Sequence, residues 1–249
     1  MVEALLRGRR RRDNDRLALA ASGYAALGWP VCLGAQPRGR QPRERQRRDR
    51  VPQQRQPERW PGGTTPRNPP QRARLGRACS CDRVGCPAPG AHPLSPAWKL
   101  QATADPAVVG RWWSERPQAS ILLVTGRSFD VLDIPAAAGL RAIRWLERAA
   151  IRSGPVAVSA DERTLFFVAS RAANADEDEW WSCHLDCEPE VLPEVTGLRW
   201  HCRDSYVVAP PSRLSNGSAA RWLTEPDNQP LPDALRLLEV LADACEEIA

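Results

Sequence analysis

Two short apolar runs rich in β-forming residues constrain the fold of this chain most. They cover residues 121–124 and 129–134, and Thr125, Gly126 and the two residues after them have the composition of a turn. We predict a β-hairpin whose second strand ends in the carboxylate of Asp133. Side chains of a strand alternate between two faces, so a second acid at position 135 would lie beside Asp133. Such a pair can hold two divalent ions for phosphoryl transfer. Position 135 is a proline, and Asp130 points to the opposite face, so only half of such a site is predicted.

Helical and strand-like patterns alternate along the rest of the chain. Helices are expected over 14–27, from Asp105 onward, over 136–153 and over 233–248, with Asn14 or Asp15 capping the first and Gly28 ending it. A second hairpin is expected from strands 156–159 and 164–169. This mixture predicts an α+β fold.

Charge is divided unevenly along the chain. Residues 1–77 contain 19 arginines and 6 acids, whereas residues 78–249 contain 16 basic and 24 acidic residues. The net charge of +5 therefore combines a front segment of +13 with a body of −8. The overall basicity does not by itself predict a body that binds nucleic acid.

Most of the front charge lies in residues 36–77, which contain 13 arginines, 3 acids and almost no aliphatic residues. Such a segment cannot bury enough apolar surface to offset the entropy of ordering it, so we predict a disordered insertion within the domain. It would serve either as a solvated spacer or as a basic tether for phosphate backbones. The candidate nucleic-acid-binding residues are Arg38, Arg40, Arg43, Arg45, Arg47 and Arg48.

Three cysteines and a histidine follow within fourteen residues, separated by turn-forming Gly and Pro. Cys79, Cys81, Cys86 and His92 can surround a tetrahedral ion without regular secondary structure, which favours a closed, structural zinc site. The alternative is a loop with free thiols. A second candidate metal cluster comprises Cys183, His184, Cys187, His201 and Cys202. The alternative is that these residues lie in a pair of strands with their thiols buried in the core.

Export and membrane insertion are not expected. Arg9 to Arg12 precede an apolar stretch, but Asp13 and Asp15 interrupt it and the apolar residues recur at helical spacing. No apolar run reaches the ~18 residues that a membrane span needs. We therefore expect a cytoplasmic protein.

Several of these blocks occur in the order seen in one known family. The sequence resembles the bifunctional DNA primase/polymerase N-terminal (Prim-Pol) family, of the archaeo-eukaryotic primase type, over residues 14–222. The blocks that carry the resemblance are 27–31, 79–93, Trp112-Trp113, 124–126, 131–133 and 206–212.

The resemblance implies an RRM-like catalytic sheet with flanking helices. The residue pattern adds a Cys/His zinc-type loop at 78–93, and a C-terminal linker and amphipathic helix at 223–249. The resemblance also implies DNA and nucleotides as partners, and two Mg²⁺ or Mn²⁺ ions held by acids. Whether a replication or helicase protein is a partner is left open by the sequence. Asp133 is the catalytic candidate. The sequence departs from the family at all three motifs, with Pro135 in place of the second acid, Thr164 in place of a histidine, and Arg199 to Arg203 in place of a third acid.

Two functional hypotheses remain open. The first is a DNA primase/polymerase-like protein, in which a single remaining acid leaves weak or no nucleotidyl transfer. The second is a catalytically inactive module on the same scaffold that binds nucleic acid or another protein.

Overall fold

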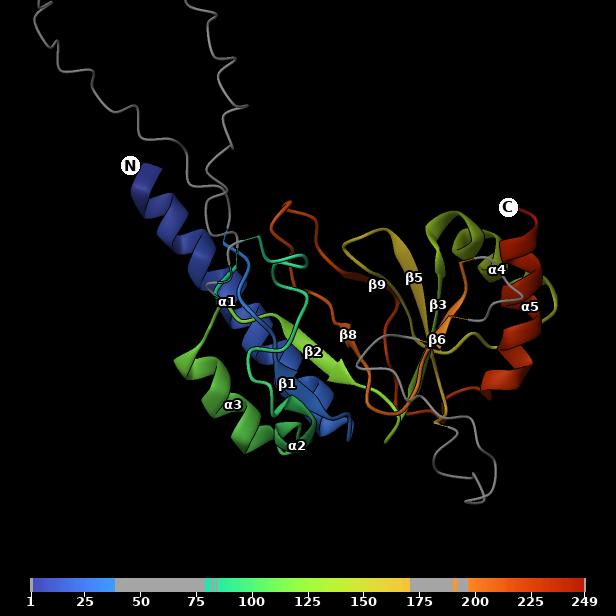
Figure 1. The fold of residues 1–249 in the computed structure, drawn as a ribbon, viewed down its shortest axis with the longest axis horizontal. Coiled ribbons are helices and arrows are strands. Elements are labelled where there is room, and N and C mark those ends of the chain that lie inside the picture. Colours follow the sequence, from blue (N-terminus) through green and yellow to red (C-terminus); the bar gives the residue numbers. More distant parts are fainter. Residues whose placement is uncertain are drawn as a thin grey trace, which may run out of the picture.

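The computed structural model describes residues 2–38, 79–81, 83, 85–170, 190–191 and 197–248 (Figure 1). It confirms the α+β class, with helices packed against two antiparallel sheets. Within this described part, no helix is both long enough and apolar enough to cross a membrane.

The smaller sheet has the strand order β1-β2-β8, and the three N-terminal helices lie beside it. Its strands are β1 (Val31–Leu33), β2 (Ile121–Val124) and β8 (Tyr206–Val208), and its helices are α1 (Val2–Ala26), α2 (Trp98–Gln101) and α3 (Pro106–Glu115). Asp105 caps α3 as predicted, because its carboxylate accepts the amide of Ala107 at 2.8 Å. Helix α1 begins well before the predicted caps Asn14 and Asp15, and it ends before Gly28, whose φ is +77°.

The larger sheet has the strand order β6-β7-β3-β5-β4-β9. Its strands are β3 (Asp130–Pro135), β4 (Val156–Val158), β5 (Arg163–Val168), β6 (Glu190–Val191), β7 (Arg199–His201) and β9 (Arg221–Thr224). The central order β7-β3-β5-β4 reads 4-1-3-2 in chain order with every pair antiparallel, which is the arrangement of an RRM sheet. The predicted hairpin of β4 and β5 is confirmed.

Helices α4 (Ala136–Arg148) and α5 (Ala234–Glu246) cover one face of the larger sheet. Small residues let α4 approach closely, and a Cβ atom on Gly139 would lie 2.0 Å from Oγ1 of Thr164 on β5. The buried stripe of α4 is Ala138, Gly139, Ala142 and Leu146, whereas Leu140 is 53% exposed.

The opposite face of the larger sheet packs against the N-terminal helices through aromatic rings. Trp29 stacks on Phe167 of β5 with ring centroids 5.2 Å apart, and Phe129 lies 4.6 Å from Trp29. Tyr24 of α1 donates its hydroxyl to the carbonyl of Pro210 at 2.7 Å and accepts the indole N–H of Trp222 at 2.9 Å. One core therefore joins α1 to both sheets.

The predicted hairpin of residues 121–134 is wrong, because β2 and β3 belong to different sheets. Both edges of β2 are taken by β1 and β8, so β3 cannot pair with it. The turn between them is real, since the amide of Gly126 donates to the carbonyl of Phe129 at 2.8 Å. Thr125 holds this turn toward β7 by donating its hydroxyl to the carbonyl of Cys202 at 2.6 Å. The turn passes the chain from one sheet to the other.

Candidate functional site

Asp133 lies in the middle of the larger sheet, on the face opposite α4 and α5. The register of β3 places it directly across from Leu165 on β5 and Arg199 on β7. Only 4% of the residue is exposed. Asp130 lies on the other face, as predicted, where its carboxylate accepts the indole N–H of Trp200 at 3.2 Å.

Both oxygens of the Asp133 carboxylate have protein partners. Arg163 donates from Nε to Oδ1, and Nε2 of His201 lies 3.1 Å from Oδ2. The guanidinium of Arg163 also donates to the carbonyl of Asp133 at 3.0 Å and to that of Gly197. The imidazole of His201 is oriented by a contact at its other ring nitrogen, because its Nδ1 lies 3.0 Å from the hydroxyl of Ser205. The carboxylate is thus held on both sides by groups that are buried with it.

Neither partner of Asp133 was predicted from the sequence. The histidine position of the second family motif falls on Thr164, but Thr164 faces Gly139 on α4. Arg163, one residue earlier, is on the Asp133 face, across from Pro135 in the strand register. The two-residue alternation of β5, with Leu165 and Phe167 facing the same way as Arg163, is the signal that could have identified it.

The other acids near the motifs do not complete a metal site with Asp133. Asp161 accepts the hydroxyl of Ser159 at 2.6 Å in an exposed turn, and Asp204 lies 3.8 Å from Nζ of Lys99. Across the described ranges, the one cluster of three or more Cys, His or acidic residues close enough to share an ion does not include Asp133. Pro135 offers no ligand atom, and Arg199 brings a positive charge where a third acid would stand. The residues that the structure describes around Asp133 therefore do not fit a pair of divalent ions.

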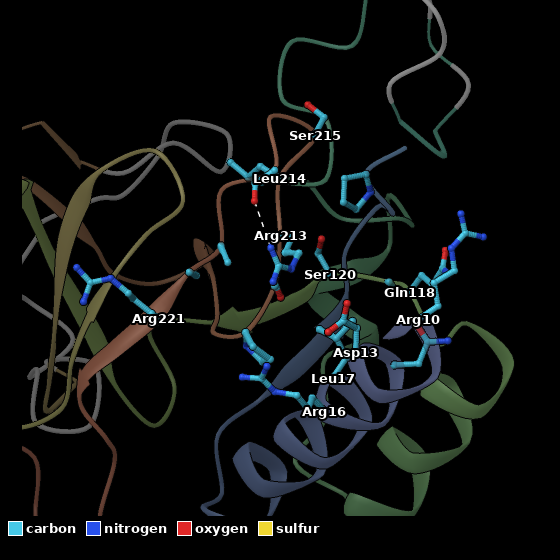
Figure 2. A pocket seen from close by; sticks show the side chains of 18 residues that line it. Arg10, Asp13, Arg16, Leu17, Gln118, Ser120, Arg213, Leu214, Ser215 and Arg221 are labelled. Carbon is cyan, nitrogen blue, oxygen red and sulfur yellow. Dashed lines mark hydrogen bonds between the residues drawn. The ribbon is translucent and has the colours of Figure 1, made fainter. Parts of the chain in front are cut away.

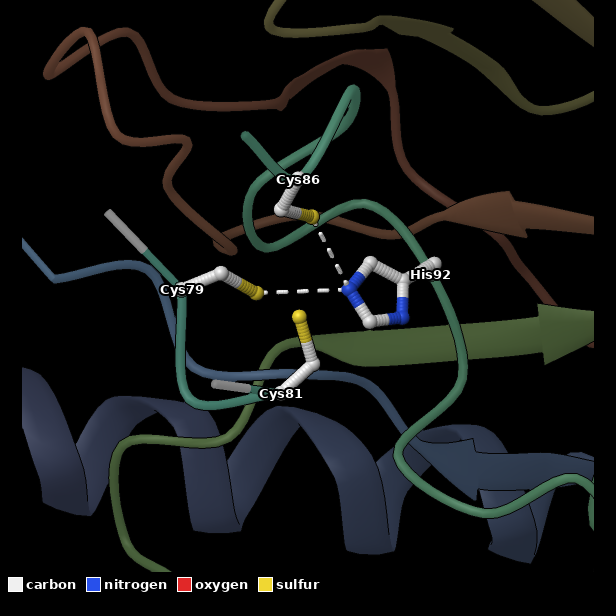
Figure 3. Close-up of side chains that lie close together, drawn as sticks. All are labelled: Cys79, Cys81, Cys86 and His92. Carbon is white, nitrogen blue, oxygen red and sulfur yellow. Dashed lines mark hydrogen bonds between the residues drawn. The ribbon is translucent and has the colours of Figure 1, made fainter. Parts of the chain in front are cut away.

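That one cluster is formed by the predicted residues Cys79, Cys81, Cys86 and His92, whose ligand atoms all lie within 4.8 Å of one another. Figure 3 shows the three sulfurs and the imidazole directed toward a common centre. Nε2 of His92 is 3.3 Å from Sγ of Cys79 and 3.4 Å from Sγ of Cys86. Nδ1 lies 2.9 Å from the carbonyl of Pro93, which leaves Nε2 available as a ligand. The cluster could bind a metal ion.

Backbone contacts build this cluster onto the smaller sheet. Ala35, just after β1, donates its amide to the carbonyl of His92 at 2.8 Å, and Gln36 and Ser80 exchange two further hydrogen bonds. The amide of Arg83 lowers the pKa of Cys81 to about 7, whereas burial raises the pKa of Cys86 to about 11. Cys81 therefore loses its proton more readily than Cys86 does.

The remaining candidates are only partly described. Arg38 is exposed at the end of a described range, whereas Arg40, Arg43, Arg45, Arg47 and Arg48 lie outside the described residues. Of the second cysteine cluster, Cys183, His184 and Cys187 lie outside them too, and His201 is engaged with Asp133 and Ser205. Cys202 is disulfide-bonded, so its thiol is not available as a metal ligand. The roles predicted for the residues outside the described ranges stay predictions.

No curated protein matches the sequence. The sequence profile of the family described as bifunctional DNA primase/polymerase, N-terminal, matches residues 21–234, a span that includes both sheets, the Cys/His cluster and Asp133. The chain therefore belongs to the bifunctional DNA primase/polymerase N-terminal (Prim-Pol) family.

Proposed function

We propose that this protein is a primase/polymerase-like member of the Prim-Pol family, of the archaeo-eukaryotic type, that performs weak or no nucleotidyl transfer. The observation that carries this proposal is the double engagement of Asp133 by Arg163 and His201. Phosphoryl transfer through two metal ions needs carboxylate oxygens that are free to coordinate them.

Electrostatics supports the same conclusion. A divalent ion at Asp133 would have to displace one or both partners of the carboxylate and then lie beside the guanidinium of Arg163, with Arg199 across the strand pair. Like charges in a buried site repel strongly, because the low local dielectric screens them little. The Mg²⁺ or Mn²⁺ pair that the family implies is therefore not assigned to this site.

The second candidate function is a nucleic-acid-binding or protein-interaction module on the same scaffold. It is favoured by the concentration of 19 arginines within residues 1–77. DNA is the expected partner, since clustered cations bind phosphate backbones and release counterions. Deletion of residues 39–77 should weaken binding to DNA and flatten its salt dependence, and unchanged binding would leave that segment as a spacer.

Primer extension tests the catalytic proposal. Wild type, Asp133→Asn and the control Asp161→Asn are incubated with primed DNA, nucleoside triphosphates and either Mg²⁺ or Mn²⁺. We expect equally little extension from all three proteins. Robust extension by wild type and Asp161→Asn that Asp133→Asn abolishes would overturn the proposal.

We further propose that the Cys/His cluster holds a structural zinc ion. Three sulfurs and one imidazole nitrogen form the closed, four-ligand set typical of structural zinc. The hydrogen bond from His92 to the carbonyl of Pro93 is the kind of outer contact that orients a zinc-bound imidazole. Such an ion would fix the loop to β1 and take no part in chemistry.

A further inference from the structure

A cavity of about 440 Å³ lies beside the smaller sheet and does not include Asp133 (Figure 2). Its walls are α1, residues 118–120 just before β2, and the segment 211–221 that leads from β8 into β9. Neither Arg163 nor His201 lines it. The cavity is therefore separate from the motif site.

The lining of this cavity is strongly basic. Its charged residues are one acid, Asp13, and four arginines, namely Arg10, Arg16, Arg213 and Arg221. Arg213 donates to the carbonyl of Gly217 at 3.3 Å. The other three guanidinium groups form no ion pair or hydrogen bond with any residue that the structure describes. Guanidinium groups with unused donors are the side chains best suited to phosphate oxygens.

Two buried serine hydroxyl groups in the cavity wall also have hydrogen-bonding capacity that no described residue uses. Ser120 is 2% exposed, and its Oγ has no hydrogen-bond partner among the described residues. Ser212 is equally buried and accepts the amide of Ile121 at 2.8 Å, but its hydroxyl donates to no described residue. An unpaired buried hydroxyl costs folding free energy, so a ligand that accepts its proton would explain why it is there.

The segment that carries Arg213 is held in a fixed shape. Arg213 forms a β-bridge with Ala219, and the amide of Leu214 donates to the carbonyl of Ser218 at 2.9 Å. The amide of Ala220 donates to the carbonyl of Ser212 at 2.9 Å. A site whose donors are already positioned loses less entropy when a ligand binds.

We propose that this cavity binds the phosphate groups of a nucleic-acid strand, with Arg16, Arg213 and Ser120 at its centre. Figure 2 shows Arg10 and Arg221 at opposite ends of the lining, with Arg16 and Arg213 between them. This spread suits successive phosphates of a strand better than one small anion. Pro37 lines the cavity as well, so Arg38, the next residue and the first arginine of residues 36–77, lies next to the cavity in the chain. The inference rests on the proposed function only in taking nucleic acid as the partner.

Equilibrium binding to the full-length protein tests this site without added divalent ions and without catalysis. The probes are a labelled single-stranded DNA of about 16 nucleotides and, separately, a fluorescent nucleoside triphosphate. The double variant Arg16→Gln/Arg213→Gln should bind about tenfold more weakly, with a salt slope lower by up to about two. The control Arg144→Gln/Arg148→Gln removes two exposed arginines from α4 and should change affinity by less than about threefold, because distant surface charges are screened.

Ser120→Ala separates ligand binding from a structural role. It should weaken probe binding about fivefold or more, since a hydrogen bond to a charged group is lost. The melting temperature of the free protein should be unchanged or higher, because an unpaired buried hydroxyl is removed. Loss of affinity for DNA supports a strand site, and loss for the triphosphate alone assigns the same phosphate site to a nucleotide. Wild-type affinity of both variants for both probes would overturn the proposal, whatever the primer-extension result.

Discussion

Arg163 donates from its Nε to Oδ1 of Asp133 across the β3–β5 strand pair. The negative charge of the acid that was expected to bind metal is therefore balanced by an arginine of the same sheet. The two side chains are 15% and 6% exposed, and His201 holds the second oxygen of the same carboxylate. A buried charge of this kind is retained only when it is paired and hydrogen-bonded. Asp133 therefore has a structural explanation that does not involve a metal ion.

The Asp133–Arg163 pair should show strong thermodynamic coupling. Arg163→Met leaves Asp133 with His201 alone, and loss of one partner of a buried pair costs about 3–5 kcal/mol of unfolding free energy. The double variant Asp133→Asn/Arg163→Met should cost clearly less than the sum of the two single variants. Urea denaturation measures all three. Arg152→Met, which breaks the exposed pair with Asp227, is the control and should cost less than about 1 kcal/mol. The account would be contradicted if the costs of Asp133→Asn and Arg163→Met simply add in the double variant.

Two glycines inside helices should respond in opposite directions to alanine. Gly139→Ala on α4 places a methyl group 2.0 Å from Oγ1 of Thr164, and the overpacking should cost about 1–3 kcal/mol. Gly110→Ala on α3 meets nothing within 4 Å and should stabilise by about 0.5–1 kcal/mol. Thermal unfolding of the two variants measures the difference. A stabilised Gly139→Ala would mean that α4 does not lie this close to β5.

The buried hydroxyl of Tyr24 should make stability depend on alkaline pH. Burial raises the pKa of Tyr24 above that of an exposed tyrosine, against the smaller lowering effect of the hydrogen bond from Trp222. Its contribution is therefore full below pH ~10, where tyrosine in the unfolded chain is still protonated, and is lost as the pH rises through the higher folded pKa. Tyr24→Phe should lower the free energy of unfolding by about 1–3 kcal/mol at neutral pH. Above pH ~10 the variant should lose less stability with rising pH than wild type does. Parallel pH profiles for wild type and variant would contradict this.

Metal analysis tests the Cys/His cluster. Purified wild type should contain about one zinc ion per chain, and Cys81→Ser/Cys86→Ser should contain none, with a lower melting temperature. Burial raises the pKa of Cys32 to about 12, so this cysteine stays a thiol outside the cluster and Cys32→Ala should keep the zinc. A wild-type protein purified without metal, and insensitive to chelators, would rule out a structural ion.

Features encoded within a short stretch could be predicted from the sequence. Cys79 to His92 lie within fourteen residues, and the Asp105 cap depends on amides only two and three residues away. The β4–β5 hairpin also followed from local pattern, because its two strands are joined by one short turn.

Features that depend on distant segments could not be predicted. The strand character of β2 and β3 was recognised, but an apolar run does not identify a strand's partner, and β2 pairs with Val31–Leu33 and Tyr206–Val208. Arg163 and His201, the two partners of the Asp133 carboxylate, follow it in the chain by 30 and 68 residues. The cavity likewise joins α1 to residues about two hundred positions later in the chain, which no local pattern reports.

Manganese binding measures the central claim most directly. Titration of the zinc-loaded protein with Mn²⁺ in the presence of a non-hydrolysable nucleoside triphosphate, followed by electron paramagnetic resonance, counts the ions bound by wild type and by Asp133→Asn. Because Arg163 and His201 occupy both oxygens of Asp133, the two proteins should bind the same number of ions with the same affinity. One or two additional Mn²⁺ ions bound by wild type and lost in Asp133→Asn would contradict the account.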